Sequence, residues 1–311
     1  MSRRMNMKTM NKNLSLGFVV CGLLSAVSPV LADDASDKLP PSGTVYDKVR
    51  GELSVGTKAP TRERMVNAIK SATPTQLQAM LEYGQRVECF ECIPLLEQKL
   101  LSSNSSDVRE IAAWWLRQRA FGFGPVMVHM QKVVVGDQDP VQRARAAQAL
   151  GEFLDPHALP ALKKAASSDG DADVRISAVR ALGRLNAVAG NDTLISALSD
   201  SEAGVRRAAL EQLPRVNFFH DDAALVARLG DSSAPVRRLA AQLVGERKID
   251  GALDALLGML MTDDDASVRQ AAAIALGRLG GSDAFAALAD AKKSEKDDRV
   301  LDAIDIAARM H

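Results

Sequence analysis

The sequence predicts an all-α protein in which about seven helix pairs stack into a solenoid behind an N-terminal helical cap. Three observations predict this fold. A ten-residue string recurs along the chain, its copies lie 31 to 34 residues apart, and each copy carries one apolar stripe with helical spacing. A helix pair of this size cannot bury its apolar face alone, so it must stack on its neighbours. The seven copies are VREIAAWWLR from Val108, QRARAAQALG from Gln142, VRISAVRALG from Val174, VRRAALEQLP from Val205, VRRLAAQLVG from Val236, VRQAAAIALG from Val268 and VLDAIDIAAR from Val300.

Residues 1–32 have the composition of a secretory signal peptide. A basic and polar start is followed by an almost wholly apolar run over residues 14–31, and the last three residues are short or small, as a signal peptidase requires. An uncleaved anchor is disfavoured by Pro29 and by a length at the low edge of the about 17–25 residues that a span needs. We expect cleavage after Ala32, a periplasmic or secreted protein, and no transmembrane segment after cleavage. Met10 would serve equally well as the first residue.

The rest of the chain divides into three parts. Residues 33–59 mix acids, Pro, Gly and Ser without an apolar period, which is typical of a linker or flexible arm. Residues 60–92 are predicted to form the N-terminal helical cap, with short amphipathic helices over 61–71 and 75–83 and a CxxC motif at the end. Residues 93–311 then form the repeat solenoid.

Each repeat unit has the same internal order. An alanine follows the recurring arginine by three residues and an aliphatic residue follows it by seven, so one face of the second helix is apolar. Residues that resemble helix N-caps come before this stripe; they are Asp107, Asp139, Asp173, Ser233 and Asp265. Eight residues after the arginine stand Gly151, Gly183, Gly245 and Gly277, with Pro214 in the fourth unit. The spacing leaves open whether these glycines permit close packing or end the helix.

The repeated string resembles the HEAT repeats, in particular the short bacterial kind also seen in phycobilisome lyases. This resemblance implies a right-handed superhelix of helix pairs whose second helices line the inner face. It also implies a ladder in which an aspartate before each second helix and an arginine at its start tie one repeat to the next. Carried to this chain, the ladder would consist of Asp107, Asp173, Asp265, Arg109, Arg143, Arg175, Arg206, Arg237 and Arg269. The alternative for the arginines is a row of anion-binding groups. Leu301 stands where the seventh arginine is expected, which suggests that the last unit is a cap.

The sequence shows no catalytic constellation. Repeat-built hydroxylases of this architecture use His-Glu pairs as iron ligands, and the chain has no such dipeptide. Its four histidines are His129, His157, His220 and His311, which lack the spacing of a helical metal site. There is also no glycine-rich phosphate loop and no nucleophile motif. We therefore expect no enzyme, no metal and no cofactor.

The charge pattern argues against nucleic acid as a partner. The 39 basic and 39 acidic side chains cancel over the whole chain, but residues 1–32 hold four bases and no acid, so the remainder carries a net −4. The predicted inner-face positions nine residues past the arginines alternate in sign, whereas a phosphate-tracking groove needs a continuous basic strip.

The Cys89-Phe90-Glu91-Cys92 motif allows several interpretations. Haem attachment requires histidine after the second cysteine, and Ile93 stands there. Zinc would need two further ligands that the histidines do not supply. A redox dithiol is chemically plausible because Cys92 is predicted near a helix start, but the βαβ setting of thioredoxins is absent. A structural disulfide in an oxidising compartment is the interpretation that we favour.

Aromatic residues gather in the first unit. Six of the eleven aromatic residues beyond the signal lie between Tyr83 and Phe123. An irregular end unit accounts for this, because the aromatics can fill the junction between the cap and the first repeat. The alternative is that Trp114, Phe121 and Phe123 form a partner-binding site, since aromatic side chains are frequent interface hot spots.

These observations favour a non-catalytic exported scaffold that binds another periplasmic or membrane protein, for which a protein partner is expected and its identity is open. One alternative is a periplasmic redox or chaperone-like assistant that uses Cys89 and Cys92. Another is a ligand-binding solenoid like the bilin lyases, although a shared fold does not carry function. The oligomeric state is open as well.

Overall fold

The computed structural model describes residues 59–217, 219 and 221–310. Every described residue belongs to a single compact unit. The predicted signal peptide and all but the last residue of the predicted arm lie outside the described residues, as do His220 and His311. Within the described ranges the regular structure is entirely helical, as the sequence predicts.

The helices form successive pairs. The first helices are α2 (Arg62–Ser71), α4 (Cys92–Ser102), α6 (Phe123–Gly136), α8 (Leu159–Ser168), α10 (Asn191–Ala197), α12 (Asp222–Val226), α14 (Leu253–Thr262) and α16 (Ser282–Ser294). The second helices are α3 (Pro74–Tyr83), α5 (Ser106–Leu116), α7 (Pro140–Phe153), α9 (Ala172–Leu185), α11 (Ala203–Gln212), α13 (Ala234–Arg247), α15 (Ala266–Leu279) and α17 (Asp298–Ala307). The seven predicted pairs are thus α4/α5 to α16/α17, and the N-terminal cap is itself a further pair.

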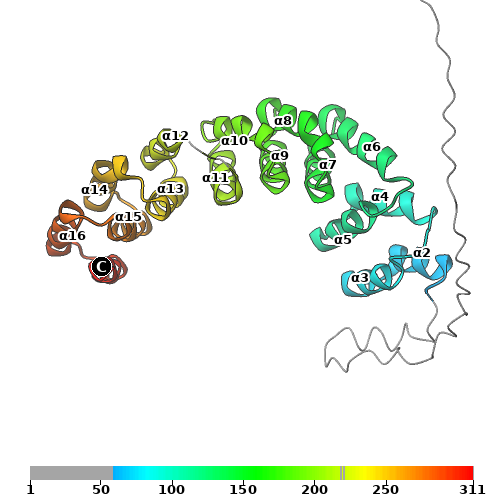
Figure 1. Cartoon of the computed structure of the whole chain (residues 1–311), viewed down its shortest axis with the longest axis horizontal. Coiled ribbons are helices and arrows are strands. Elements are labelled where there is room, and N and C mark those ends of the chain that lie inside the picture. Colours follow the sequence, from blue (N-terminus) through cyan, green and yellow to red (C-terminus); the bar gives the residue numbers. More distant parts are fainter. Residues whose placement is uncertain (1–58, 218, 220, 311) are drawn as a thin grey trace, which may run out of the picture. The chain divides into compact units, whose positions relative to one another are not determined.

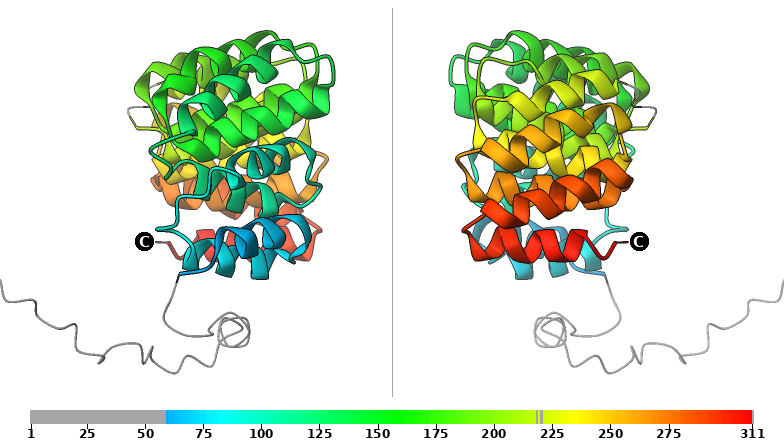
Figure 2. Two further views of the ribbon diagram at one scale, coloured as in Figure 1. Left: turned by 90° about the vertical axis from the view of Figure 1, so that its right-hand side faces the viewer. Right: turned by 90° about the vertical axis from the view of Figure 1, so that its left-hand side faces the viewer.

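Consecutive second helices lie side by side. Each of α5 to α15 packs on the next second helix along the chain. Figure 1 shows these helices along the inner side of the curved row of pairs, with the first helices along the outer side. The side views in Figure 2 show the same layered stacking of pairs. Residues of α5, α7, α9 and α11 line one common pocket.

Local sequence signals set the helix starts. The two helices of the N-terminal pair begin within one residue of the predicted positions. Thr73 caps α3 through a capping box with Gln76, and Pro74 is the first residue of that helix. Asp139 caps α7 ahead of Pro140 by accepting the Val141 backbone N–H at 2.9 Å. Short polar side chains accept hydrogen bonds from the free backbone N–H groups of the first turn. These helix starts can therefore be predicted from the sequence.

The core is the predicted apolar stripe. In α9, the side chains of Val174, Ala178 and Leu182 are at most 1% exposed. The same three positions are buried in α15, and the first two of them are buried in α17. Each repeat contributes few large side chains, so the helices must approach closely to exclude water from the stripe.

The recurring glycines are the points of closest approach. The helices α7, α9, α13 and α15 continue past them, so their role is packing and not helix termination. A Cβ atom on Gly277 would lie 2.7 Å from the Cα atom of Ala307 in the next second helix, and one on Gly245 would lie 2.7 Å from the Cα atom of Ala275. Gly151 meets Ala181 in the same register. In these three units the glycine faces the alanine of the next unit, whereas Gly183 faces the Gln212 side chain.

Candidate functional site

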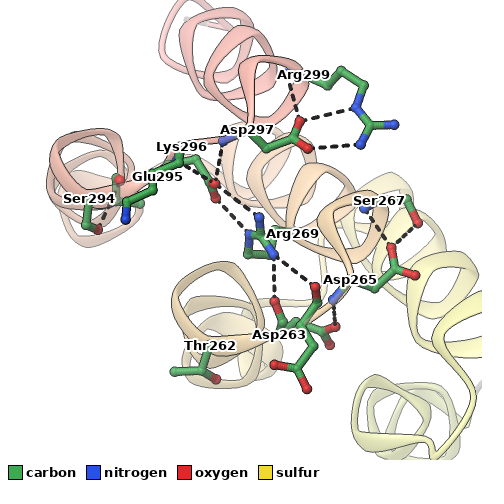
Figure 3. A network of polar contacts seen from close by, with 12 residues as sticks. Thr262, Asp263, Asp265, Ser267, Arg269, Ser294, Glu295, Lys296, Asp297 and Arg299 are labelled. Atoms are coloured by element: carbon green, nitrogen blue, oxygen red, sulfur yellow. Dashed lines mark hydrogen bonds and ion pairs between the residues drawn. The ribbon is translucent and has the colours of Figure 1, made fainter.

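Five of the six recurring arginines bind a carboxylate of the following repeat. Arg206 shows the pattern: its Nε and Nη2 atoms donate to the Asp231 carboxylate at 2.7 Å each, and its Nη1 atom donates to the Asp200 carbonyl at 2.8 Å. We call each such arginine–carboxylate pair a rung of the ladder. Each rung joins the loop of its own unit to the loop of the next unit. The rungs are Arg143 with Asp169, Arg175 with Asp200, Arg206 with Asp231, Arg237 with Asp263 and Arg269 with Glu295. Figure 3 shows the last rung and its surroundings.

The assignment of Asp107, Asp173 and Asp265 as the acids of this ladder was wrong. Asp265 caps α15, where its carboxylate accepts from the Ser267 backbone at 2.8 Å. Asp107 and Asp173 lie in the first turns of α5 and α9, which are capped by Ser105 and Asp171. The true acids stand in the loop before each second helix, where the side chain can reach back to the preceding repeat. Asp107 and Asp173 are therefore not the N-caps either.

Ser233 also departs from the capping prediction. It occupies the N-cap position of α13, but its side chain makes no capping hydrogen bond. Its backbone N–H instead donates to the Asp231 carboxylate at 2.9 Å. The ladder acid therefore organises this helix start.

The first rung is different because Arg109 does not reach a carboxylate. Asp137 occupies the ladder position of the next unit, but it lies 28 residues after Arg109, whereas the other rungs span 25 or 26 residues. The Arg109 Nε atom donates to the Gln148 side chain at 3.0 Å, and its Nη1 atom donates to the Ser103 carbonyl at 2.8 Å. Burial and the neighbouring Arg145 guanidinium lower the pKa of Arg109.

The ladder holds its carboxylates ionised. The hydrogen bonds from Arg269 lower the pKa of Glu295 to about 2, against the opposing effect of burial. The pKa of Asp169 is also lowered, chiefly by hydrogen bonding to Arg143. Since arginine is always charged near neutral pH, these rungs are structural ion pairs and offer no group that titrates near pH 7.

Cys89 and Cys92 are brought together at the entry to the first repeat. Their sulfur atoms lie 2.01 Å apart and their Cα atoms 5.2 Å apart. Both side chains are at most 1% exposed, and Cys92 is the first residue of α4. A buried sulfur pair is poorly placed to exchange with an external thiol.

A buried arginine that the sequence pattern does not predict fixes the loop before the cysteines. Arg119 is 5% exposed, and its guanidinium carbon lies 4.1 Å from the ring centroid of the fully buried Trp115. Its Nη2 atom donates to the Gln85 carbonyl at 2.7 Å and its Nη1 atom to the Val87 carbonyl at 3.3 Å. Arg119 lies outside the repeated string, so only its place in the aromatic-rich unit could have drawn attention to it.

The three predicted partner-binding aromatics have different surroundings. Phe123 packs edge to face on Phe153, with ring centroids 5.2 Å apart, so it belongs to the core. Phe121 is 66% exposed in the loop before α6. Trp114 is half-buried on α5 and lines a pocket against α3. Of the three, Trp114 is therefore the one placed at a concave surface of the second helices.

Two pockets open on the second helices. The first, of about 490 Å³, lies between α3 and α5, with a further contribution from α7; it combines Trp114 with carboxylates from Glu82, Asp107 and Glu110. The second, of about 430 Å³, runs along α5, α7, α9 and α11 and ends at the short turn after α11. Its lining residues are Arg109, Gln148, Ser177, Arg180, Ala181, Arg184, Gln212 and Arg215. The inner face thus places an acidic pocket beside a basic one.

The described histidines do not form a metal site. His129 contacts Glu97 at 2.6 Å and His157 contacts Asp155 at 2.7 Å, in separate units. Across the part of the chain that the structure describes, no group of three or more His, Cys, Asp or Glu side chains is arranged to hold a metal ion. No helix in the same part is both long and apolar enough to cross a membrane.

The comparison with protein families decides the family. The sequence profile of HEAT repeats matches residues 129–214 and 223–308, which is more than half of the chain. The chain belongs to the HEAT repeat family. The family resemblance and the all-α solenoid expected from the repeated string are thereby confirmed, and the ladder and the glycine contacts are the physical basis of the stacking.

Solved HEAT-repeat structures share the fold at low sequence identity. YibA of Escherichia coli is 16% identical, with a TM-score of 0.53 over 88% of this chain and 98% of that one. The condensin Cnd3–Cnd2 subcomplex of Schizosaccharomyces pombe is 20% identical, with a TM-score of 0.55 over 80% of this chain and 37% of that one. A comparison with curated proteins finds no match.

Proposed function

We propose that this HEAT-repeat protein is a non-catalytic exported scaffold that holds a protein partner along its inner face. The observation that carries the proposal is the placement of both pockets on the second helices, where charged and polar side chains and the half-buried Trp114 line them. A solenoid presents such a face as one extended binding surface. The S. pombe condensin structure, which shares the fold, is that of a complex between two subunits.

Export is the second part of the proposal. It rests on the signal-like composition of residues 1–32 and on the paired cysteines, which suit an oxidising compartment. We propose that Cys89 and Cys92 form a structural disulfide and that Arg119, by binding the carbonyls ahead of Cys89, holds the same loop. The burial of both sulfurs supports this role over a redox one. The intact mass of the exported protein tests the proposal, since the mature chain should begin at Asp33.

Two positions in one repeat, each carrying a photo-cross-linker in turn, test whether the inner face binds the partner. Ser177 lies on α9 in the inner-face pocket, and Lys164 lies exposed on α8 of the same unit. A cross-linker at position 177 should give a discrete adduct with one exported protein, and Trp114→Ala should lower its yield, because both residues line the same face. A cross-linker at position 164 should give no such adduct. Equal products from both positions would contradict an inner-face site.

A further inference from the structure

The second pocket is a row of guanidinium groups with an unusual charge balance. Its lining contains four arginines and no acid. Arg180 is paired with Glu211 at 3.3 Å, and Arg184 is paired with Glu152. Arg109 and Arg215 make no ion pair with any acid in the described part of the chain. The pocket therefore keeps two cationic groups in excess.

The neutral side chains of the pocket complete a polar lining. Gln148 holds the Arg109 guanidinium from α7, and Ser177 lies on α9 between the two ends. Gln212 is 6% exposed, and its side chain fills the space that faces Gly183. These amides and the hydroxyl can donate hydrogen bonds to an anion as well as accept them from a peptide backbone.

The length of the row discriminates between ligands. The pocket crosses four consecutive second helices, and packed helices lie about 8–10 Å apart, so the row extends over about 25–30 Å. A single phosphate group could contact only a few neighbouring donors of such a row. An extended polypeptide advances about 3.3 Å per residue, so about eight residues would cover it. Guanidinium forks bind carboxylates in a bidentate manner, which favours aspartate and glutamate side chains on that polypeptide.

We propose that the pocket formed by Arg109, Arg180, Arg184 and Arg215 binds an acidic, extended segment of the protein partner. This inference rests on the proposed scaffold function and specifies the chemistry of the partner. The segment lies across α5 to α11 with its carboxylates on the arginines that have no internal acid. The acidic pocket beside Trp114 repels such a segment, so the segment stops at α5 and Trp114 contacts another part of the partner.

The test is a titration of the full mature chain with four probes. Fluorescence anisotropy or calorimetry measures the binding. The probes are a labelled ten-residue peptide with alternating glutamates, a matched lysine peptide, inorganic phosphate and pyrophosphate. The glutamate peptide should bind with an affinity that falls as salt rises, and the lysine peptide should not bind this pocket. Tight binding of phosphate or pyrophosphate that displaces the glutamate peptide would overturn the proposal in favour of a small-anion site.

A matched pair of variants locates the site. Arg215 and Arg278 occupy the same repeat position, but Arg278 lies on α15 and pairs with Glu246 at 3.4 Å. Arg215→Gln should lower the affinity for the glutamate peptide about tenfold, as expected for loss of one charge-assisted hydrogen bond. Arg278→Gln should change it less than about twofold. Both variants should unfold at the wild-type temperature, since neither side chain is part of the core. Equal effects of the two substitutions would overturn the proposal.

The two proposals fail separately. If inner-face cross-linking at Ser177 succeeds while the glutamate peptide fails to bind, the scaffold function stands and the acidic partner segment is wrong. If the cross-linking itself shows no preference for the inner face, the scaffold proposal falls and this inference falls with it.

Discussion

Arg206 and Asp231 form the most enclosed rung of the ladder. Their side chains are 9% and 2% exposed, and two hydrogen bonds of 2.7 Å join them across a repeat boundary. The Asp231 carboxylate also accepts the backbone N–H of Ser233 at 2.9 Å. One carboxylate thus holds the start of its own second helix and the arginine of the preceding one.

Removing this carboxylate should destabilise the solenoid strongly. Asp231→Ala leaves the Arg206 guanidinium enclosed without its partner, which costs about 3–5 kcal/mol in the free energy of unfolding. As a control, Asp222 and Arg247 form a pair whose side chains are 50% and 36% exposed. Asp222→Ala should cost about 0–1 kcal/mol. Urea unfolding followed by circular dichroism measures both, and similar losses would show that the ladder is no stronger than a surface pair.

The glycine at a repeat boundary should not tolerate a methyl group. Gly277→Ala places Cβ 2.7 Å from the Ala307 backbone, so α15 and α17 must separate, at a cost of about 1–3 kcal/mol. Gly258 lies in α14, and a Cβ atom added to it would have no neighbouring atom within 4 Å. Gly258→Ala should stabilise the protein by about 0.5–1 kcal/mol, because alanine is the better helix former. The two melting temperatures should therefore move in opposite directions, and a stabilising Gly277→Ala would refute the close-packing role.

The contribution of the last rung, Arg269 with Glu295, to the free energy of unfolding should change with pH in the acid range. Because the folded-state pKa of Glu295 is lowered from 4.5 to about 2, its contribution is complete above about pH 4.5 and is lost as the pH falls towards about 2. Glu295→Gln should therefore be less stable than the wild type by a constant amount between about pH 6 and 8, and the difference should shrink below about pH 4.5. Unfolding curves at pH 7, 4 and 3 measure this. A difference that grows as the pH falls would contradict the sign of the shift.

The cysteine pair should be inert in the native protein. The chain has three cysteines, and Cys21 lies within the predicted signal peptide, so the mature protein retains Cys89 and Cys92. Protein purified without reductant should show no thiol before or after denaturation, and two thiols after denaturation with reductant. Because both sulfurs are buried, reduction of the folded protein should be slow. Rapid native-state reduction would instead favour the redox alternative, with Cys92 as the first residue to mutate.

The positions of the repeat units could be predicted from the sequence because stacking imposes the same residue pattern on every unit. The valine, alanine and aliphatic positions recur since each second helix meets its neighbours in the same way, and the HEAT fold follows from them. The ladder acids were missed although an equally clear signal was present. An acid stands six residues before each ladder arginine from Asp137 onward, and before Leu301 as well, whereas Ser103 holds this position ahead of Arg109. Each of these acids except Asp137 binds the arginine of the preceding unit, so the pattern within one unit cannot pair them.

The candidate site could be predicted only in part. Trp114 was found because its position departs from the pattern of the other units. The arginine pocket was not, because Arg180, Arg184 and Arg215 come from two repeat positions whose residue type and charge vary along the chain. Their proximity depends on which second helices pack together. The Arg119 contact with Trp115 was not predicted for a different reason, since Arg119 lies outside the repeated string and has no counterpart in the other units.

Hydrogen exchange of the protein with and without its cross-linked partner tests the central claim most directly, namely that the inner face is the binding surface. Binding should slow backbone exchange in α5, α7, α9 and α11, whose side chains form the arginine pocket and its rim. The first helices α6, α8 and α10 should exchange as in the free protein. Protection confined to those first helices would contradict the account.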